Sequence, residues 1–204
     1  MSNKLPATGK KMLFKKISVV PLTAGRWDDF ERLFGSKGAC GGCWCMYWRL
    51  KRAEFIRSKG EGNKKHFKKI VYKQQPAPGL LLYAGNEPAG WCALAPRSEY
   101  PVLNHSRILK PVDDQLVWSI VCFFIDKNFR RMGLTEIFLE YALKFCKNEG
   151  AEIVEGYPVD VKDNEEYPEV FAYTGIASAY LKAGFTEVAR RSPKRPVMRY
   201  VFRG

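Results

Sequence analysis

The apolar stretch LVWSIVCFFI, residues 116–125, constrains the fold of this chain more than any other feature of its sequence. Ser119 is its only polar residue, and a short run so rich in β-branched and aromatic residues is typical of a strand buried on both faces. After a loop, apolar residues recur with the spacing of an amphipathic helix: Leu134, Ile137, Phe138, Tyr141, Ala142 and Phe145. This order predicts a sheet that is layered against helices.

The sequence on either side of this strand and helix predicts hairpins. Residues 80–96 have the pattern of a hairpin that turns at Asn86–Pro88, and residues 186–203 contain two final strands. Because hairpins pair their strands antiparallel, the pattern indicates a mixed sheet rather than a purely parallel one. The predicted fold class is α/β, in an α+β layered arrangement.

The N-terminal third predicts one strand and several helices. The strand lies within residues 13–22, and Thr23 is expected to cap a helix that Gly35 ends. Residues 52–74 predict one or two basic helices, broken near Gly60 and Gly62.

Length and composition favour one folded domain. A chain of 204 residues can bury a real hydrophobic core, and 46% of its residues are hydrophobic. We expect a flexible basic tail over residues 1–11 and a single domain over residues 12–204. With no apolar run near the roughly 20 residues that span a bilayer, we expect a soluble, cytoplasmic protein and no membrane partner.

The formal net charge of +13 predicts an anionic binding partner, such as nucleic acid, anionic lipid or a phosphorylated ligand. Of the six cysteines, Cys92, Cys122 and Cys146 lie in apolar segments, where a reduced cysteine behaves as a small hydrophobe. A reducing cytosol is therefore the simpler assumption.

The loop between the apolar strand and the helix has features of an anion-binding site. A helix N-terminus presents unpaired backbone N–H groups at the positive end of the helix dipole. Gly133 removes a side chain that would hold a ligand away, while Arg130 and Arg131 add positive charge. A sharp turn with surface arginines explains this segment alone equally well.

Two motifs at compatible spacing resemble the GNAT superfamily of acyl-CoA N-acyltransferases. Its recurrent motif is Gln/Arg-x-x-Gly-x-Gly/Ala, which the run from Arg130 to Thr135 matches except that Thr135 stands at the third fixed position. The second is Tyr-x-Lys-x-Gly-Phe, matched by Tyr180, Lys182, Gly184 and Phe185. The asparagine frequent seven residues before that tyrosine is replaced by Tyr173.

The resemblance spans residues 80 to 202 and implies a GNAT-like, mostly antiparallel central sheet flanked by helices. It implies that residues 80–204 bind acetyl-CoA as co-substrate, while residues 12–75 help to shape the acceptor site. The apolar strand would hold the pantetheine arm and the loop the diphosphate. The cofactor-binding residues so implied are Val121, Cys122, Phe123, Phe124, Ile125, Arg130, Arg131, Met132, Gly133, Leu134 and Thr135.

Acetyl transfer to an amine needs a base for the ammonium and an acid for the departing thiolate. By the resemblance, Tyr180 is the candidate acid, since a phenol with a pKa near 10 suits donation to a thiolate. Glu155 is the first candidate base and Glu99 the second. Each residue also has a non-catalytic interpretation. Tyr180 would then be a tyrosine packed in the core, and Glu155 and Glu99 would be exposed carboxylates.

An acidic loop stands out in this basic chain and is expected near the mouth of the acceptor site, where it would concentrate a cationic amine. The alternative is a solvated loop without a specific role. Its acidic residues are Asp160, Asp163, Glu165, Glu166 and Glu169.

The segment CGGCWCMYWR, residues 40–49, invites a metal interpretation because Cys40, Cys43 and Cys45 have C-x-x-C-x-C spacing. A closed zinc site needs a fourth ligand, and His66 and His105 are the only histidines. We therefore predict no metal. A redox dithiol is a second interpretation.

We prefer an acceptor pocket lined by residues of this segment, and a hydrophobic plug under the sheet is the alternative. A subset of GNAT sequences resembles it in a Cys-Trp-Cys-Met-Tyr-Trp-Arg stretch, with Gly-Trp-Cys and Tyr-Pro-Val strands like those at residues 90–92 and 157–159. The predicted substrate-binding residues are Trp44, Met46, Trp48 and Arg49.

These observations predict an N-acetyltransferase that moves an acetyl group from acetyl-CoA to a primary amine by direct attack. The partners would be acetyl-CoA and a small amine or peptide acceptor of unknown identity. The sequence leaves the oligomeric state open, and a homodimer is compatible with it. The rival interpretations are a basic module bound to nucleic acid or the ribosome, which we disfavour, and an acyl-CoA sensor on the same fold without turnover.

Overall fold

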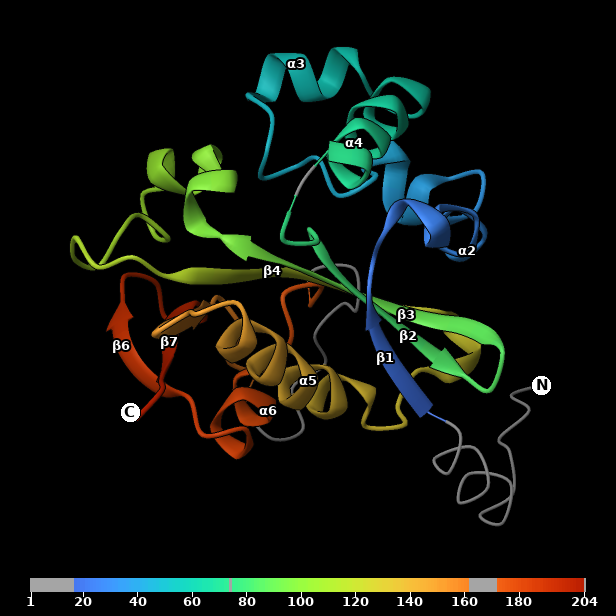
Figure 1. Cartoon of the computed structure of the whole chain (residues 1–204). Helices are drawn as coiled ribbons and strands as arrows, with labels where there is room; N and C mark the ends of the chain where they lie inside the picture. Colours follow the sequence, from blue (N-terminus) through green and yellow to red (C-terminus); the bar gives the residue numbers. More distant parts are fainter. Residues whose placement is uncertain (1–16, 74, 162–171, 204) are drawn as a thin grey trace.

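The computed structural model describes residues 17–73, 75–161 and 172–203, and its centre is one twisted sheet (Figure 1). The strand order is β1-β2-β3-β4-β5-β7-β6. Neighbours pair antiparallel except β4 and β5, which are parallel. The predicted mixed, mostly antiparallel sheet is thus confirmed. The strands are β1 Ile17–Pro21, β2 Gly79–Ala84, β3 Glu87–Pro96, β4 Trp118–Ile125, β5 Ile153–Gly156, β6 Thr186–Arg190 and β7 Pro196–Val201.

Helices cover both faces of the sheet. In Figure 1, α2, α3 and α4 lie above it and α5 and α6 below it. The α-helices are α2 Trp27–Phe34, α3 Arg52–Arg57, α4 Glu61–Lys73, α5 Leu134–Asn148 and α6 Ala177–Lys182. Short helical turns are η1 Ala24–Arg26, η2 Gly38–Gly42, η3 Arg97–Glu99, η4 Pro101–His105 and η5 Lys127–Phe129.

Two apolar cores form on the two faces of the sheet. Phe138 and Leu139 of α5 pack with Ile120 of β4 on one face, and Phe30 of α2 packs with Trp91 of β3 on the other. β4 is therefore covered on both sides, as its apolar sequence predicted.

The helix expected after Thr23 differs at its start. A 3₁₀ turn, η1, precedes α2, and Thr23 makes no side-chain cap hydrogen bond; its hydroxyl instead accepts from the Arg26 guanidinium at 3.2 Å. The predicted end is confirmed, since Gly35 follows α2 with φ 61°, a conformation that glycine adopts readily.

A β-bulge in β4 decides which side chains face which layer. The β3–β4 register shifts so that Cys122 pairs with Ala93 and Ile120 with Leu94, which leaves Val121 as the extra residue. Val121 and Cys122 consequently both join the core under α2 and α4, while Ile120 and Phe123 face α5. Bulges re-aim side chains in this way, and they are frequent beside active sites.

Candidate active site

β4 and β5 separate halfway along β4. Their last paired residues are Ile120 and Gly156, so Val121–Ile125 extends beyond the pairing with β5. In the described structure the chain just before α6 reaches this edge, because the Phe123 N–H donates to the carbonyl of Tyr173. The strand edge predicted to hold a pantetheine arm thus exists.

The loop from β4 to α5 turns sharply. The Asp126 carboxylate accepts from the N–H of Asn128 at 2.9 Å, and Arg130 Nε donates to the carbonyl of Ile125 at 3.1 Å. Arg131 and Gly133 have φ of 59° and 74°, and Met132 between them is not among the residues with positive φ. Alternation of this kind turns successive backbone amides into a concave nest suited to an anion.

Gly133 has a backbone conformation that other residues rarely adopt, and it leaves the approach to the loop open. It is the N-cap of α5 and contributes no side-chain cap, so the first amides of the helix face the loop. A Cβ at Gly133 would meet nothing within 4 Å. Buried Met132 and Leu134 anchor the loop on each side of this open approach, while Arg130 and Arg131 are exposed and Thr135 is half-buried. The residues present therefore fit a diphosphate.

A pocket of about 550 Å³ lies on the α2 and α4 side of β4, beside the point where β5 departs. Its walls are largely apolar and aromatic, and Lys59 and Arg195 are the only charged residues that line it within the described part of the chain. The lining residues are Phe34, Ala39, Cys40, Gly41, Cys43, Cys45, Tyr47, Trp48, Phe55, Lys59, Ala93, Val121, Cys122, Phe123, Phe124, Tyr173 and Arg195.

Of the predicted substrate-binding residues, only Trp48 lines this pocket. Its indole nitrogen is buried without a hydrogen-bond partner among the described residues. Trp44 and Met46 are buried in the core beneath α2, and Trp44 stacks on Trp27. Arg49 lies over the ring of Tyr100 and bonds Glu99 at 3.0 Å. For Trp44, Met46 and Arg49 the structure thus gives a packing or loop-anchoring role in place of the predicted one.

Tyr180 lies beneath the opening between β4 and β5 and is fully buried. Its hydroxyl donates to the carbonyl of Thr174 at 3.1 Å, and its ring packs edge-on against Phe123. Burial raises the pKa of this phenol well above its usual value, so it stays protonated at neutral pH. Gly156 makes room for the ring, since a Cβ there would come within 2.1 Å of it.

Glu155 sits in a buried ion-pair network and does not line the pocket. Its side chain is 1% exposed. One carboxylate oxygen accepts from Arg97 at 2.9 Å and from the Tyr157 hydroxyl at 2.7 Å, and the other accepts from Arg199 at 2.8 Å. A carboxylate whose two oxygens are both engaged by donors is poorly placed to take a proton from substrate. This environment argues against the predicted role as general base.

The second candidate base, Glu99, is 43% exposed and pairs with Arg49. It does not line the pocket either. Of the acidic loop only Asp160 falls within the described residues, where it pairs with Arg190 at 2.8 Å; Asp163, Glu165, Glu166 and Glu169 lie outside them.

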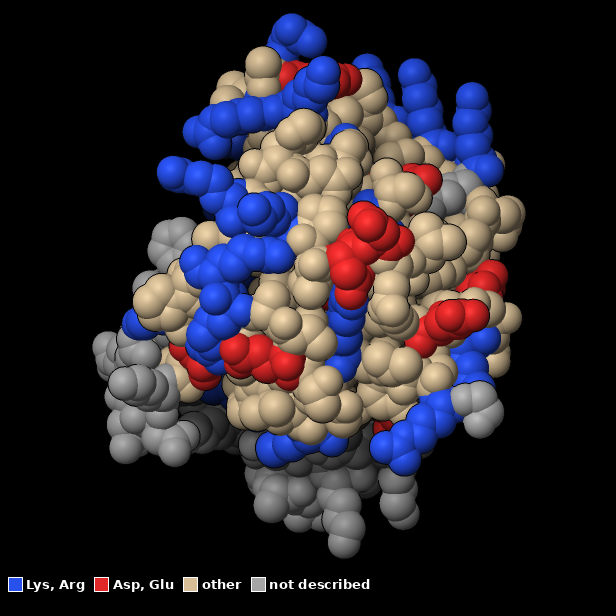
Figure 2. Space-filling model, turned by 90° about the vertical axis from the view of Figure 1, so that its left-hand side faces the viewer, with Lys and Arg blue, Asp and Glu red and all other residues tan. Residues whose placement is uncertain are grey.

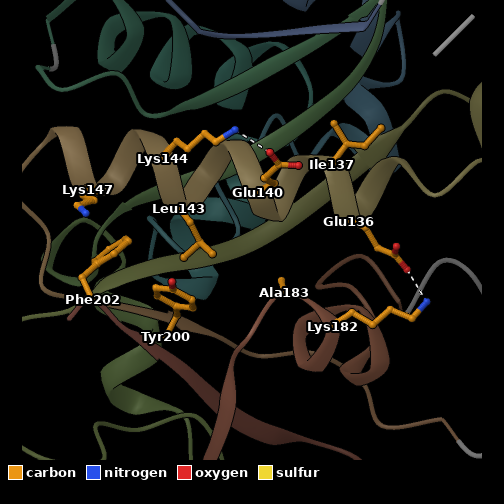
Figure 3. Close-up of a pocket in the computed structure, with 10 residues that line it drawn as sticks. All are labelled: Glu136, Ile137, Glu140, Leu143, Lys144, Lys147, Lys182, Ala183, Tyr200 and Phe202. Atoms are coloured by element: carbon orange, nitrogen blue, oxygen red, sulfur yellow. Dashed lines mark hydrogen bonds and ion pairs between the residues drawn. The ribbon is translucent and has the colours of Figure 1, made fainter. Parts of the chain in front are cut away.

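A second hollow, of about 610 Å³, lies between α5, α6 and the end of β7 (Figure 3). Leu143, Tyr200 and Phe202 give it an apolar side. Glu136 of α5 pairs with Lys182 of α6 at 2.8 Å across the hollow, and Glu140 pairs with Lys144 along α5 at 2.6 Å. Because these charges are already paired and exposed, the groove offers less to catalysis than the pocket beside β4.

The remaining features concern metals, membranes and surface charge. Within the described residues, no three His, Cys, Asp or Glu side chains are grouped to hold a metal ion. No described helix is both long and apolar enough to cross a bilayer. Figure 2 shows Lys and Arg standing out from the upper part of the molecule, where α3 and α4 lie in Figure 1, with acidic groups in the middle of the same face.

A known protein family matches the part of the chain that contains β4 and the loop at Gly133. A sequence model described as the acetyltransferase (GNAT) family matches residues 44–166, more than half of the chain. The chain belongs to the GNAT acetyltransferase family. The matched span includes β4, the loop at Gly133 and all of α5. The chain is thus an acetyltransferase whose co-substrate is acetyl-CoA, as its resemblance to the family implied.

Solved structures share the GNAT fold at low identity. A GNAT acetyltransferase from Listeria monocytogenes superposes with a TM-score of 0.55 at 9% identity, covering 91% of this chain and 95% of that one. PaiA N-acetyltransferase from Thermoplasma acidophilum, solved with coenzyme A, gives 0.50 at 14%, covering 91% and 99%. The NatC complex bound to Gag peptide and CoA gives 0.51 at 10%, covering 92% and 99%. No curated protein sequence matches this GNAT chain.

Several pocket residues of this GNAT domain were not predicted from the sequence. Tyr173 was noted only as a departure from the family pattern, yet it lines the pocket, and burial raises the pKa of its phenol. Lys59 and Arg195 come from distant segments. Cys122 was predicted as a cofactor-binding residue, and the bulge in β4 turns it toward the pocket.

Proposed function

We propose that this GNAT domain transfers the acetyl group to a primary amine that enters the pocket beside β4 and attacks directly. The observation that carries the proposal is the position of Val121–Phe124. This segment ends at the loop before Gly133, extends beyond the pairing with β5, and lines the pocket. A donor held on the strand and an acceptor held in the pocket would meet there, which is the positioning that direct transfer needs.

The lining of the pocket indicates the class of acceptor. Phe34, Phe55 and Trp48 suit an apolar or aromatic body, while Lys59 and Arg195 suit a carboxylate. With no carboxylate among the described lining residues, nothing in that lining favours a polycation. We therefore propose an amine that carries an apolar body and a carboxylate, such as an amino acid or a small peptide.

We keep Tyr180 as the proposed general acid. Its protonated phenol lies against Phe123, beneath the point where β4 and β5 separate. The Tyr180 hydroxyl can donate to a departing thiolate only if it gives up its bond to the Thr174 carbonyl. Tyr173 is the tyrosine with which Tyr180 is compared by substitution, because its side chain already lines the pocket. For the amine proton we propose solvent water in place of Glu155, because both Glu155 oxygens are engaged.

The proposal is tested with a panel of amines and amino acids, by following the consumption of acetyl-CoA and the mass of the product. We expect turnover with acceptors that combine an apolar body and a carboxylate, and little with polyamines. Tyr180→Phe should lower turnover with little change in CoA affinity, and Tyr173→Phe is its comparison. Full activity of Tyr180→Phe would refute the acid assignment, and CoA binding without turnover on any amine would favour a sensor.

The diphosphate site is tested by CoA titration. Arg130→Ala should weaken CoA binding, and Gly133→Ala should do so by placing a methyl group in the open approach at a positive φ. Arg57→Ala on α3 removes the same charge from an exposed position outside the loop and is the matched control. Equal affinity of all three variants would show that CoA does not use this loop.

A further inference from the structure

Four of the six cysteines meet at the pocket beside β4, and the proposed function makes no use of their thiol groups. Cys40, Cys43 and Cys45 come from the C-x-x-C-x-C segment, and Cys122 comes from β4. All are free thiols; Cys40 is exposed, and the other three are partly exposed. The fourth cysteine that sequence spacing did not supply is therefore provided by the fold.

Two unusual backbone features bring Cys45 and Cys122 together. Trp44 and Cys45 have consecutive positive φ values of 45° and 57°, which turns the segment back over the sheet. On the sheet, the bulge at Val121 points Cys122 to the same side. Cys45 and Cys122 both line the pocket there, and the neighbouring Cys45 thiol raises the pKa of Cys122. The Cys45 sulfur accepts the indole N–H of Trp91 at 2.9 Å.

We propose that Cys45 and Cys122 form a reversible disulfide when the protein meets a hydroperoxide, so that the pocket is a thiol oxidation site. The Cys45 sulfur attacks first: it takes a hydroxyl group from hydrogen peroxide and becomes a sulfenic acid, while its thiol proton joins the hydroxide that leaves and forms water. The Cys122 sulfur then attacks the Cys45 sulfur and the S–O bond breaks. The thiol proton leaves with that hydroxyl as water. Two thiols and one peroxide thus give one disulfide and two waters.

The surroundings of the sulfurs assign these roles. Cys45 accepts the indole N–H of Trp91 at the sulfur that attacks the peroxide. The neighbouring Cys45 thiol, together with burial, raises the pKa of Cys122 well above the usual value. It therefore keeps its proton until it resolves the sulfenic acid.

Cys43 is less suited to either step. Burial, followed by the neighbouring Cys45 thiol, raises the pKa of Cys43 to about 11. It is thus a neutral thiol near pH 7. Cys40 is a free, exposed cysteine.

The test is a peptide map of the whole reduced protein after treatment with hydrogen peroxide and alkylation of the remaining thiols. Trypsin cuts at Lys37, Arg49, Arg107 and Lys127, so the expected product joins peptide 38–49 to peptide 108–127. Fragmentation across Trp44 must place the bridge on Cys45. Dithiothreitol should restore both peptides.

Variants make the assignment specific. Cys43→Ser should still form the bridge, and it simplifies the map because it changes the same peptide. Cys122→Ser should form none, and buried Cys146→Ser should behave as the wild type. A bridge between Cys43 and Cys45, a bridge at Cys40, or sulfinic acid without any bridge in the wild-type protein would overturn the proposal, whatever the variants do.

One consequence rests on the proposed function. Because Cys122 lies on the segment that meets both donor and acceptor, the bridge should abolish turnover, and dithiothreitol should restore it. The mass assay needs no activity, so the two ideas fail separately. A bridge in a protein that never turns over refutes the function, whereas full turnover without any bridge after peroxide refutes the oxidation site.

Discussion

Replacing Glu155 with glutamine separates a structural role from a catalytic one. The Glu155 carboxylate is 1% exposed and bonds both Arg97 and Arg199, whose side chains are 11% and 6% exposed. Glutamine keeps the size of the side chain but removes its charge. It leaves two largely buried guanidinium groups without their shared counter-ion.

The expected cost follows from which partners remain. Removing one member of a buried ion pair typically costs about 3–5 kcal/mol. Arg199 keeps two bonds to Asp113, at 2.6 and 2.9 Å, and Arg97 keeps its bond to the Leu109 carbonyl at 2.8 Å. We therefore expect the lower end, a loss of about 3 kcal/mol. For a chain of this length that lowers Tm by about 6–12 °C.

Urea unfolding and thermal melts at pH 7 measure this loss, together with kcat against pH for an acceptor from the panel. Glu140→Gln is the matched control, because Glu140 pairs with Lys144 on the surface, where the two side chains are 62% and 63% exposed. A surface pair of this kind contributes no more than about 0.5 kcal/mol.

The reasoning fails if Glu155→Gln unfolds like the wild type and yet loses turnover together with the acidic limb of its pH profile, where a general base becomes protonated. That result would return Glu155 to the role of general base. Loss of stability with an unchanged pH profile of kcat supports a structural carboxylate and proton removal by water.

Three further predictions concern packing and titration. Gly156→Ala should destabilise the fold by about 1–3 kcal/mol, because the new methyl group meets the Tyr180 ring, and unchanged urea unfolding would contradict that geometry. Iodoacetamide at pH 7.5 should label exposed Cys40 before Cys43, with labelling of Cys43 rising as pH approaches 11; equal rates by mass spectrometry would count against the burial described. The guanidinium of Arg199 lowers the pKa of Asp113 below its ordinary 3.8, so its stabilisation is present above that pH and is lost as the pH falls through the lowered value. Asp113→Asn should therefore be less stable than the wild type at pH 7 and equal to it in strong acid, and a stability difference that does not shrink in acid would exclude this linkage.

The sequence predicted those parts of the fold in which local pattern and tertiary packing agree. The apolar run 116–125, the helix after Gly133 and the hairpin over residues 80–96 each lie where expected, since periodicity and turn residues determine them. Thr23 failed as a cap because a 3₁₀ turn begins the helix in its place, a choice that depends on how the chain enters the layer.

The site was less predictable because it is made by contacts between distant segments. Glu155 looks like any strand carboxylate until Arg97 and Arg199, 58 and 44 residues away in the chain, close around it. Trp44 and Trp48 share one aromatic cluster in the sequence, yet only the second reaches the pocket, because the backbone reverses between them at positive φ. No single-sequence pattern reports such a reversal.

The bond from the Phe123 amide to the Tyr173 carbonyl has a thermodynamic consequence for ligand binding. Any molecule that pairs with this amide must first displace a carbonyl of the protein itself. The interaction is therefore an exchange of one acceptor for another, with a small net free energy. Affinity must then come mainly from groups further along the ligand. When that ligand dissociates, the Tyr173 carbonyl can bond the Phe123 amide again.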